Sequence, residues 1–174
     1  SLLQQRRRCE SVYQLMNSET ARINYNRVLE NLHALKQFYK HYNVISIIDG
    51  ANGEVVISTY PDIVGKTLSS FNSYIDVLNN QDVAVKDVYT SELMGQNWMT
   101  YYCPVLMTDT LTLESSDVIV GVILLDVNVN NSVDPLIHSW PGMGKTGETL
   151  LVRREGDNIV YLNDLRHKQG AALK

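Results

Sequence analysis

The first 49 residues contain neither glycine nor proline, and Gly50 is the first residue of either kind in the chain. These two residue types are the least favourable in the interior of an α-helix, so their absence over this length predicts a long uninterrupted helix. Apolar side chains recur within it at spacings of four, three and four residues, at Val28, Leu32, Leu35 and Tyr39. One face of the helix is therefore expected to pack, while its upper half faces either solvent or a partner helix.

Residues 43–138 have the pattern of a β-sheet module. The runs NVISIID and EVVIST are rich in β-branched residues and flank Gly50–Gly53, which predicts a hairpin with a short glycine turn. A short helix is expected at NSYIDVLNN, and three further strands at VAVKDVYTSE, NWMTYYCPVLM and VIVGVILLDVNV. The last run is apolar on both faces, as in a central strand covered on both sides. We therefore predict an α+β fold with a central antiparallel sheet.

A second, smaller unit is expected at the C-terminal end. Asp134 and Pro135 predict the N-cap and first residue of a short helix, PLIHSW, which ends at Pro141–Gly142. The run TLLVRREGDNIVYL then predicts a new hairpin with its turn at Glu155–Asn158. The predicted division is a long helix, a sheet module, and a linker with the opening hairpin of a second module, over residues 1–42, 43–138 and 139–174.

Charge and composition exclude several classes of function. The formal net charge is −4 with mixed signs along the chain, and no basic stripe of the kind that binds a nucleic-acid backbone is present. The longest apolar run, Val118–Leu125, has only eight residues, too few to span a membrane. We expect no metal, no cofactor and no catalytic activity, because there is no catalytic motif and the histidines stand singly, at His33, His41, His138 and His167.

The tripeptide Gly144-Lys145-Thr146 resembles the end of a nucleotide-binding phosphate loop, but its context does not fit. Such a loop needs a glycine or alanine where this chain has Ser139, a buried strand before it and a helix after it. Here a helix is predicted before it and a strand after it. Only 28 residues follow Thr146, too few for the rest of a nucleotide-binding domain. We therefore reject nucleotide binding.

Some charged and cysteine residues have more than one interpretation. Cys9 and Cys103 lie in no metal or redox motif, and a disulfide between them stays open. Arg6–Arg8 is either a juxtamembrane cluster or a solvated helix face. The C-terminal region is locally basic, and we interpret its cationic residues as solvated hairpin residues, namely Arg153, Arg154, Arg166, His167 and Lys168.

Residues 135–174, PLIHSWPGMGKTGETLLVRREGDNIVYLNDLRHKQGAALK, resemble the junction between the two modules of double Cache (PDC) domains. These are PAS-like extracytoplasmic sensor domains of histidine kinases, diguanylate cyclases and chemoreceptors. Thr146–Thr149 with LLVRREGD matches the entry of the second, membrane-proximal module. Upstream, VISIIDGANGEVVIST, DIVGKTLSS and VIVGVILLDVNV are similar to parts of the first module. The resemblance spans the whole chain and is most specific over residues 135–170.

The resemblance implies a periplasmic or extracellular domain of a membrane receptor. The long helix would descend from a first transmembrane segment absent from this chain and form a homodimer. The sheet module would bind a small molecule of unknown identity, and the output, most simply a histidine kinase or a diguanylate cyclase, would lie elsewhere in the parent protein. The second module is truncated here, so residues 145–174 would pack differently, exchange between protomers or complete the edge of the first sheet. The alternative is a PAS-like dimerisation or protein-interaction module without a small-molecule ligand.

Asp126 is the main candidate for ligand binding. It shares a strand face with Val120, Val122 and Leu124, where a carboxylate without a partner would cost several kcal/mol in desolvation. The family's amino-acid-binding members place an aspartate at the end of this strand, facing the ligand's ammonium group, and Asp126 in VILLDV matches it. An aspartate that accepts backbone amides of the following loop is the competing interpretation.

Aromatic residues complete the candidate site. Strand alternation gives Met99, Tyr101, Cys103 and Val105 one face, and Trp98, Thr100 and Tyr102 the other. The first set is more apolar and is therefore expected to face inward, which makes Tyr101 either a pocket wall or a core residue. Trp98, Tyr74 and Tyr89 are candidates to close the pocket. The related amino-acid binders carry an arginine before the tryptophan, and LMGQNW has none, so an amine, another small metabolite or no ligand remain open.

Overall fold

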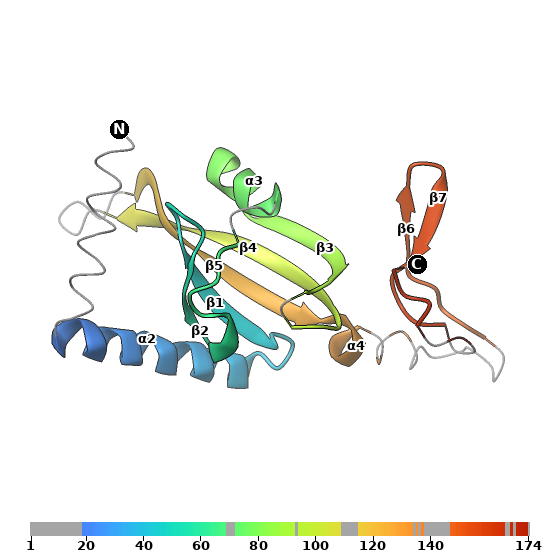
Figure 1. Cartoon of the computed structure of the whole chain (residues 1–174), viewed down its shortest axis with the longest axis horizontal. Helices are drawn as coiled ribbons and strands as arrows, with labels where there is room; N and C mark the ends of the chain where they lie inside the picture. The colour runs from blue at the N-terminus through green and yellow to red at the C-terminus, as the bar shows by residue number, and fades with distance from the viewer. Residues whose placement is uncertain are drawn as a thin grey trace. The chain divides into compact units, whose positions relative to one another are not determined.

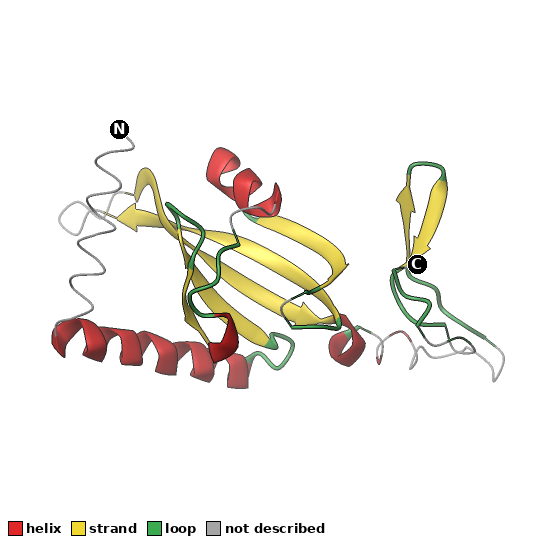
Figure 2. Ribbon diagram, viewed as in Figure 1, coloured by secondary structure: helices red, strands yellow, loops and turns green. Residues whose placement is uncertain are grey.

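The computed structural model describes residues 19–68, 72–92, 94–108, 115–133, 135, 137, 147–165, 168 and 170–173. Within them it has the predicted α+β class: a long helix, a five-stranded sheet and a separate two-stranded hairpin (Figure 2). The Gly144–Thr146 segment lies outside the described residues, as do Cys9 and Arg6–Arg8.

Helix α2 runs from Glu19 to Phe38 and forms the described part of the predicted helix. It ends four residues before the expected Tyr42, because the chain then turns toward the sheet with the Tyr42 amide donating to the Tyr39 carbonyl at 3.0 Å. The helix contacts β1 and β2 (Figure 1). The predicted apolar stripe is only partly right: Leu32 is buried, whereas Leu35 and Tyr39 are 46% and 50% exposed, and Tyr39 lies beyond the end of α2.

The sheet consists of five strands in the order β2-β1-β5-β4-β3 (Figure 1). Their bounds are Val44–Asp49 (β1), Val55–Ser58 (β2), Ala84–Thr90 (β3), Asn97–Thr108 (β4) and Ser115–Asn128 (β5). The first hairpin therefore lies at one edge, with β1 paired antiparallel to both β2 and β5. The prediction that the VIVGVILLDVNV strand is central is confirmed, and its Val122 and Leu124 are 0% and 2% exposed.

The turn that joins β1 to β2 requires a glycine at its first position. The Gly50 amide donates to the Val120 carbonyl of the neighbouring strand. A Cβ atom on Gly50 would lie 2.9 Å from the Ile119 carbonyl oxygen and 3.1 Å from the Gly121 amide nitrogen. Because both are backbone atoms, no change of rotamer would relieve the clash.

The shorter elements connect these strands. Helix α3 spans Asn72–Asn80, as predicted, and a 3-10 turn, η1, spans Pro61–Ile63. A short helix that the sequence did not predict, α4, spans Val129–Ser132 directly after β5, with the Asn128 side chain accepting from the Asn131 amide as its N-cap. Pro135 and Ile137, which belong to the helix predicted after Asp134, are helical as well.

The C-terminal hairpin has the predicted form. Strands β6 (Val152–Glu155) and β7 (Asn158–Tyr161) pair antiparallel, and Gly156 takes a positive φ of 62° in the turn. They form a sheet of their own. Among the three arrangements considered for residues 145–174, completion of the first sheet's edge is therefore wrong for the strands that the structure describes.

Contacts within the chain define two compact units, residues 1–85 with 101–126 and residues 86–100 with 127–174. In the first, the sheet residues Ile45, Ile48, Val55, Val122 and Leu124 are almost fully buried. In the second, Val88, Val129 and Leu162 form a buried cluster against which Met99, Val133 and Leu173 pack. Among the described helices, none combines the length and apolar character needed to cross a membrane.

Candidate functional site

Asp126 lies near the end of the central strand and is 3% exposed. It is the register partner of Val44 on β1, and its carbonyl accepts from the Asn43 amide at 2.8 Å. Residues paired across strands share a face, so its side chain lies on the face of Leu124 and its partner Ser46. The backbone of β5 thus holds an acidic side chain in a buried position, where the carboxylate has to be matched by donors or by a cation.

The face around Asp126 contains polar side chains that the sequence analysis missed. Ser46 and Ser58 are both buried, and their hydroxyls are hydrogen-bonded to each other at 2.9 Å. Ser46 follows Val44 by two residues on the same face of β1, about 7 Å along the strand. The available signal was a serine inside each of two apolar runs, VISIID and VVIS, because paired strands can satisfy two hydroxyls together.

Tyr74 lies at the opposite end of β1 from Asp126. Its hydroxyl donates to the Asp49 carbonyl at 3.3 Å and to the Gly50 carbonyl at 3.1 Å. Burial raises the pKa of this phenol, and the nearby Asp49 raises it further. Since Val44 and Asp49 are five residues apart on one strand, the two ends are separated by about 17 Å. That is too far for one amino-acid-sized molecule to contact both Tyr74 and Asp126.

On strand β4, the face that is buried is the one that the sequence analysis expected to be exposed. Trp98, Thr100 and Tyr102 are 7%, 0% and 0% exposed, whereas Tyr101 and Cys103 are half-buried. The inward assignment of the Tyr101 face was therefore wrong. Two residues of this more polar face can be buried because their polar atoms have internal partners: the Trp98 Nε1–H donates to the Gly95 carbonyl at 2.6 Å, and the Thr100 hydroxyl is bonded to Tyr89.

Tyr89 is joined to this buried face of β4. Its hydroxyl lies 3.0 Å from the Thr100 hydroxyl oxygen, and the Lys86 ammonium lies 3.8 Å above the centre of its ring. Tyr89 itself is half-buried. The structure therefore brings Tyr89 and Thr100 together, in the unit that also contains Trp98.

Gln96 and Asn128 form a polar contact at the start of β4 and the end of β5. The Asn128 side-chain NH₂ donates to the Gln96 side-chain carbonyl, while the Asn128 side-chain oxygen, Oδ1, accepts from the Asn131 amide and caps α4. Gln96 precedes Trp98 by two residues and has a positive φ of 60°, and Asn128 is 2% exposed. Alternation along β5 gives Asn128 the same face as Asp126. The sequence analysis noted that the LMGQNW segment lacks an arginine but did not find this amide pair.

No group of three or more metal-ligating side chains occurs among the residues that the structure describes. Asp126 and Asn128 instead provide hydrogen-bond acceptors and donors in a buried setting. Such an arrangement can recognise a small polar molecule by hydrogen bonds and charge.

Neither a protein-family model nor a curated protein matches this chain. Among solved structures, the ligand-binding domain of the Campylobacter jejuni chemoreceptor Tlp3 in complex with 4-methylisoleucine is 18% identical, with a TM-score of 0.54 over 75% of this chain and 49% of that one. An extracellular ligand-binding receptor from Desulfohalobium retbaense is 12% identical, with a TM-score of 0.51 over 76% of this chain and 24% of that one. The ligand-binding domain of the Pseudomonas aeruginosa amino-acid chemoreceptor PctC in complex with GABA is 17% identical, with a TM-score of 0.49 over 80% and 63%.

This chain thus spans about a quarter to two thirds of the length of these solved chains. At such identities the first two comparisons establish the architecture and not the ligand. The chain has the fold of an extracellular receptor ligand-binding domain, and the resemblance to double Cache sensor domains is confirmed at the level of the fold.

Proposed function

We propose that this chain is the extracytoplasmic sensory domain of a transmembrane signalling receptor, and that it binds an organic amine through Asp126. The observation that carries the proposal is the burial of an acidic side chain, 3% exposed, on the central strand of a receptor-type fold. Burial in low dielectric strengthens a contact between a carboxylate and an ammonium group. The Tlp3 domain of the same fold was solved with an amine-bearing molecule, 4-methylisoleucine, which supports this class of ligand.

Trp98, Tyr89 and Tyr101 stay candidates for ligand contacts on the sequence alone. Trp98 would supply an apolar wall and Tyr89 a hydroxyl. Tyr101 is half-buried, and we propose that it lies at the rim of the ligand site. Tyr74 is left out, because its hydroxyl is bonded at the far end of β1. Gln96, an uncharged amide two residues before Trp98, favours ligands that need no bidentate cationic clamp.

In the parent protein, the proposed role is that of the sensor of a histidine kinase or, second, of a diguanylate cyclase. We keep the division into a helix (1–42), a distal module (43–138) and the opening of a proximal module (139–174) as part of this proposal. The long helix would dimerise and transmit a small shift on binding. Its exposed apolar side chains, with Ile23 at 60% and Phe38 at 79%, support such a contact. The ligand must bind one arrangement better than the other for any shift to occur.

A thermal-shift screen of amines, amino acids and carboxylates tests the ligand. A molecule at 100 times its dissociation constant should stabilise the chain by about 2.7 kcal/mol. Asp126→Asn keeps the shape of the side chain and removes its charge, so the affinity for a positive amine should fall by about 1.5–3 kcal/mol, or roughly 10- to 150-fold. Asp62→Asn, on the exposed turn η1, is the matched control and should bind as the wild type does.

Two results would contradict the proposal. Hits confined to carboxylates without an amine would exclude the ammonium contact. Equal affinity of Asp126→Asn and the wild type, with both variants folded, would remove Asp126 from the site. A silent screen combined with a stable dimer in sedimentation would instead favour the second candidate, an interaction module, which the exposed apolar side chains of α2 also support.

A further inference from the structure

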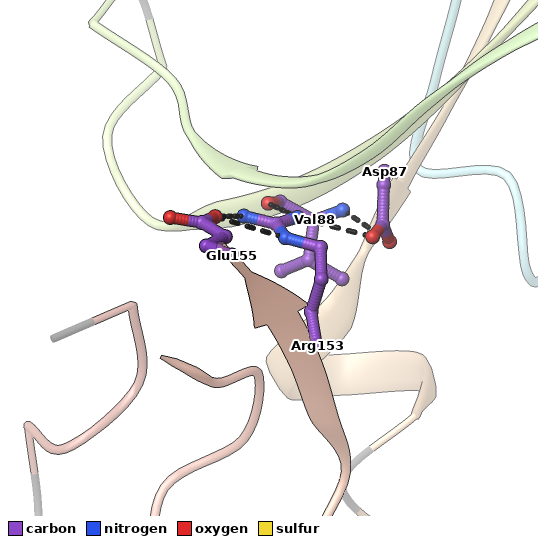
Figure 3. Close-up of polar contacts among 4 residues, drawn as sticks. All are labelled: Asp87, Val88, Arg153 and Glu155. Carbon is purple, nitrogen blue, oxygen red and sulfur yellow. Dashed lines mark hydrogen bonds and ion pairs between the residues drawn. The ribbon is translucent and has the colours of Figure 1, made fainter. Parts of the chain in front are cut away.

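Arg153 on strand β6 reaches the edge strand β3 (Figure 3). One guanidinium nitrogen, Nη1, donates to the Asp87 carboxylate at 3.0 Å and to the Val88 carbonyl at 3.1 Å. Both contacts lie within the unit of residues 86–100 and 127–174. The hairpin residue that the sequence analysis interpreted as solvated is therefore in contact with β3.

Glu155 fixes the orientation of this guanidinium. Its carboxylate oxygen accepts from Arg153 Nε at 3.0 Å and from Nη2 at 2.6 Å, and both residues belong to β6. The pKa of Arg153 is raised, first by the hydrogen bond with Glu155 and then by that with Asp87. With two of its nitrogens held by its own strand, the guanidinium presents the third toward β3 without much further loss of side-chain freedom.

An apolar contact adjoins the ionic one. Val88, whose carbonyl accepts from Arg153, is 4% exposed and forms a buried cluster with Val129 and with Leu162, which directly follows β7. The ionic contact is more open, since the Arg153 and Asp87 side chains are 30% and 53% exposed. The apolar cluster thus holds the hairpin against β3 over a small area. The guanidinium fixes the orientation of the hairpin, because it bonds to one carboxylate and one carbonyl of β3.

We propose that Arg153, oriented by Glu155, is a clamp that fixes the position of the β6–β7 hairpin on edge strand β3, so that the hairpin and the strand move as one body. Strand β3 also carries Tyr89, the residue next to Val88, whose hydroxyl is bonded to Thr100 on β4. The clamp thus joins a strand of the proposed sensor site to the entry of the second module. Only this signalling role rests on the proposed function, because the clamp itself requires no ligand.

The clamp can be tested in the ligand-free 174-residue chain by measuring a distance. Spin labels are placed at Glu92→Cys and Asp157→Cys, two exposed positions after β3 and in the hairpin turn, with Cys9 and Cys103 replaced by serine. Electron paramagnetic resonance then gives the distribution of distances between them. We expect one narrow distribution in the parent chain, and in Arg153→Ala a second, displaced population that raises the displaced-to-docked ratio about two- to fivefold.

Arg154 provides a matched control, because its Nε donates to the Gly156 carbonyl of the same hairpin at 2.8 Å. Arg154→Ala should keep the narrow distribution. Arg153→Glu places a third carboxylate beside Asp87 and Glu155 and should displace the hairpin further, and adding Asp87→Arg should restore the narrow distribution. High salt, with a Debye length of about 3 Å at 1 M, should broaden the parent but not Arg153→Ala.

An unchanged distribution in Arg153→Ala would overturn the clamp, as would the same broadening in Arg154→Ala and Arg153→Ala. Circular dichroism of each variant distinguishes displacement of a folded hairpin from general unfolding, and loss of the folded spectrum in Arg153→Glu that Asp87→Arg does not restore would count against it. A silent amine screen leaves these outcomes unaffected, so the clamp and the proposed ligand fail separately.

Discussion

The hydrogen bond between Tyr89 and Thr100 gives a quantitative test of how β3 is attached to β4. The two hydroxyl oxygens lie 3.0 Å apart, and Thr100 is 0% exposed while Tyr89 is half-buried. A neutral hydrogen bond of this kind contributes about 0.5–1.5 kcal/mol net to the free energy of unfolding. Tyr89→Phe and Thr100→Val each remove it with little change in shape, so each is expected to lower that free energy by about 1 kcal/mol.

The double variant should cost less than the sum of the two single variants. Once either hydroxyl is absent, removing the other no longer breaks this bond, so the coupling energy of the cycle should be about 1 kcal/mol. Urea unfolding measures the free energies, and for a chain of this length 1 kcal/mol corresponds to about 2–4 °C in melting temperature. Thr100→Ser keeps the hydroxyl and therefore the bond, so Tyr89→Phe should cost about as much in the Thr100→Ser background as in the wild type, and this cycle should show little coupling.

Additive costs, with a coupling below about 0.3 kcal/mol, would show that the hydroxyl pair does not attach β3 to β4 and would refute this reasoning. The same variants also bear on the sensor site. If Tyr89→Phe lowers stability and leaves stabilisation by an amine unchanged, then the Tyr89 hydroxyl is structural. If Tyr89→Phe lowers both the stability and the stabilisation by an amine, then the Tyr89 hydroxyl contacts the ligand.

Two further predictions concern single residues. Gly50→Ala should lower the free energy of unfolding by about 1–3 kcal/mol in urea, since its Cβ would lie 2.9 Å from a backbone oxygen, and a loss below about 0.5 kcal/mol would show that the turn can shift. Burial raises the pKa of the Cys103 thiol, so the folded chain with Cys9→Ser should react with iodoacetamide more slowly at mildly alkaline pH than the chain unfolded in urea, and equal rates would contradict the burial.

The course of the chain was largely predictable because local chemistry decides it. Glycine turns at Gly50–Gly53 and at Gly156 fix the two hairpins, since they supply close approach or a positive φ where other residues are strained. The central strand was predicted because both of its faces are apolar. Helix α4 was missed, since its cap, Asn128, sits at the end of a strand pattern and gives no separate signal.

Burial was harder to predict than secondary structure, because it depends on which element covers which face. Leu35 and Tyr39 continue an apolar helical stripe, yet both are exposed, so the periodicity alone did not indicate which side chains of the stripe are covered. On β4 the error came from ranking the two faces by hydrophobicity. The more polar face is the buried one, and the ranking failed because it counts Trp98 and Thr100 as polar without regard to their partners.

Internal pairing of polar groups also determines which groups near Asp126 could bind a ligand. The buried Ser46 and Ser58 on its face are bonded to each other, and the buried Asn128 farther along its strand is bonded to the exposed Gln96. Polar groups that are already paired gain little from a new partner, because each new bond replaces an existing one. A carboxylate differs because of its charge, which attracts a cation more strongly where water is excluded. Selectivity for an amine would therefore arise mainly from the single charge of Asp126, and the neutral pairs around it would act by fixing the shape of the sheet that holds it.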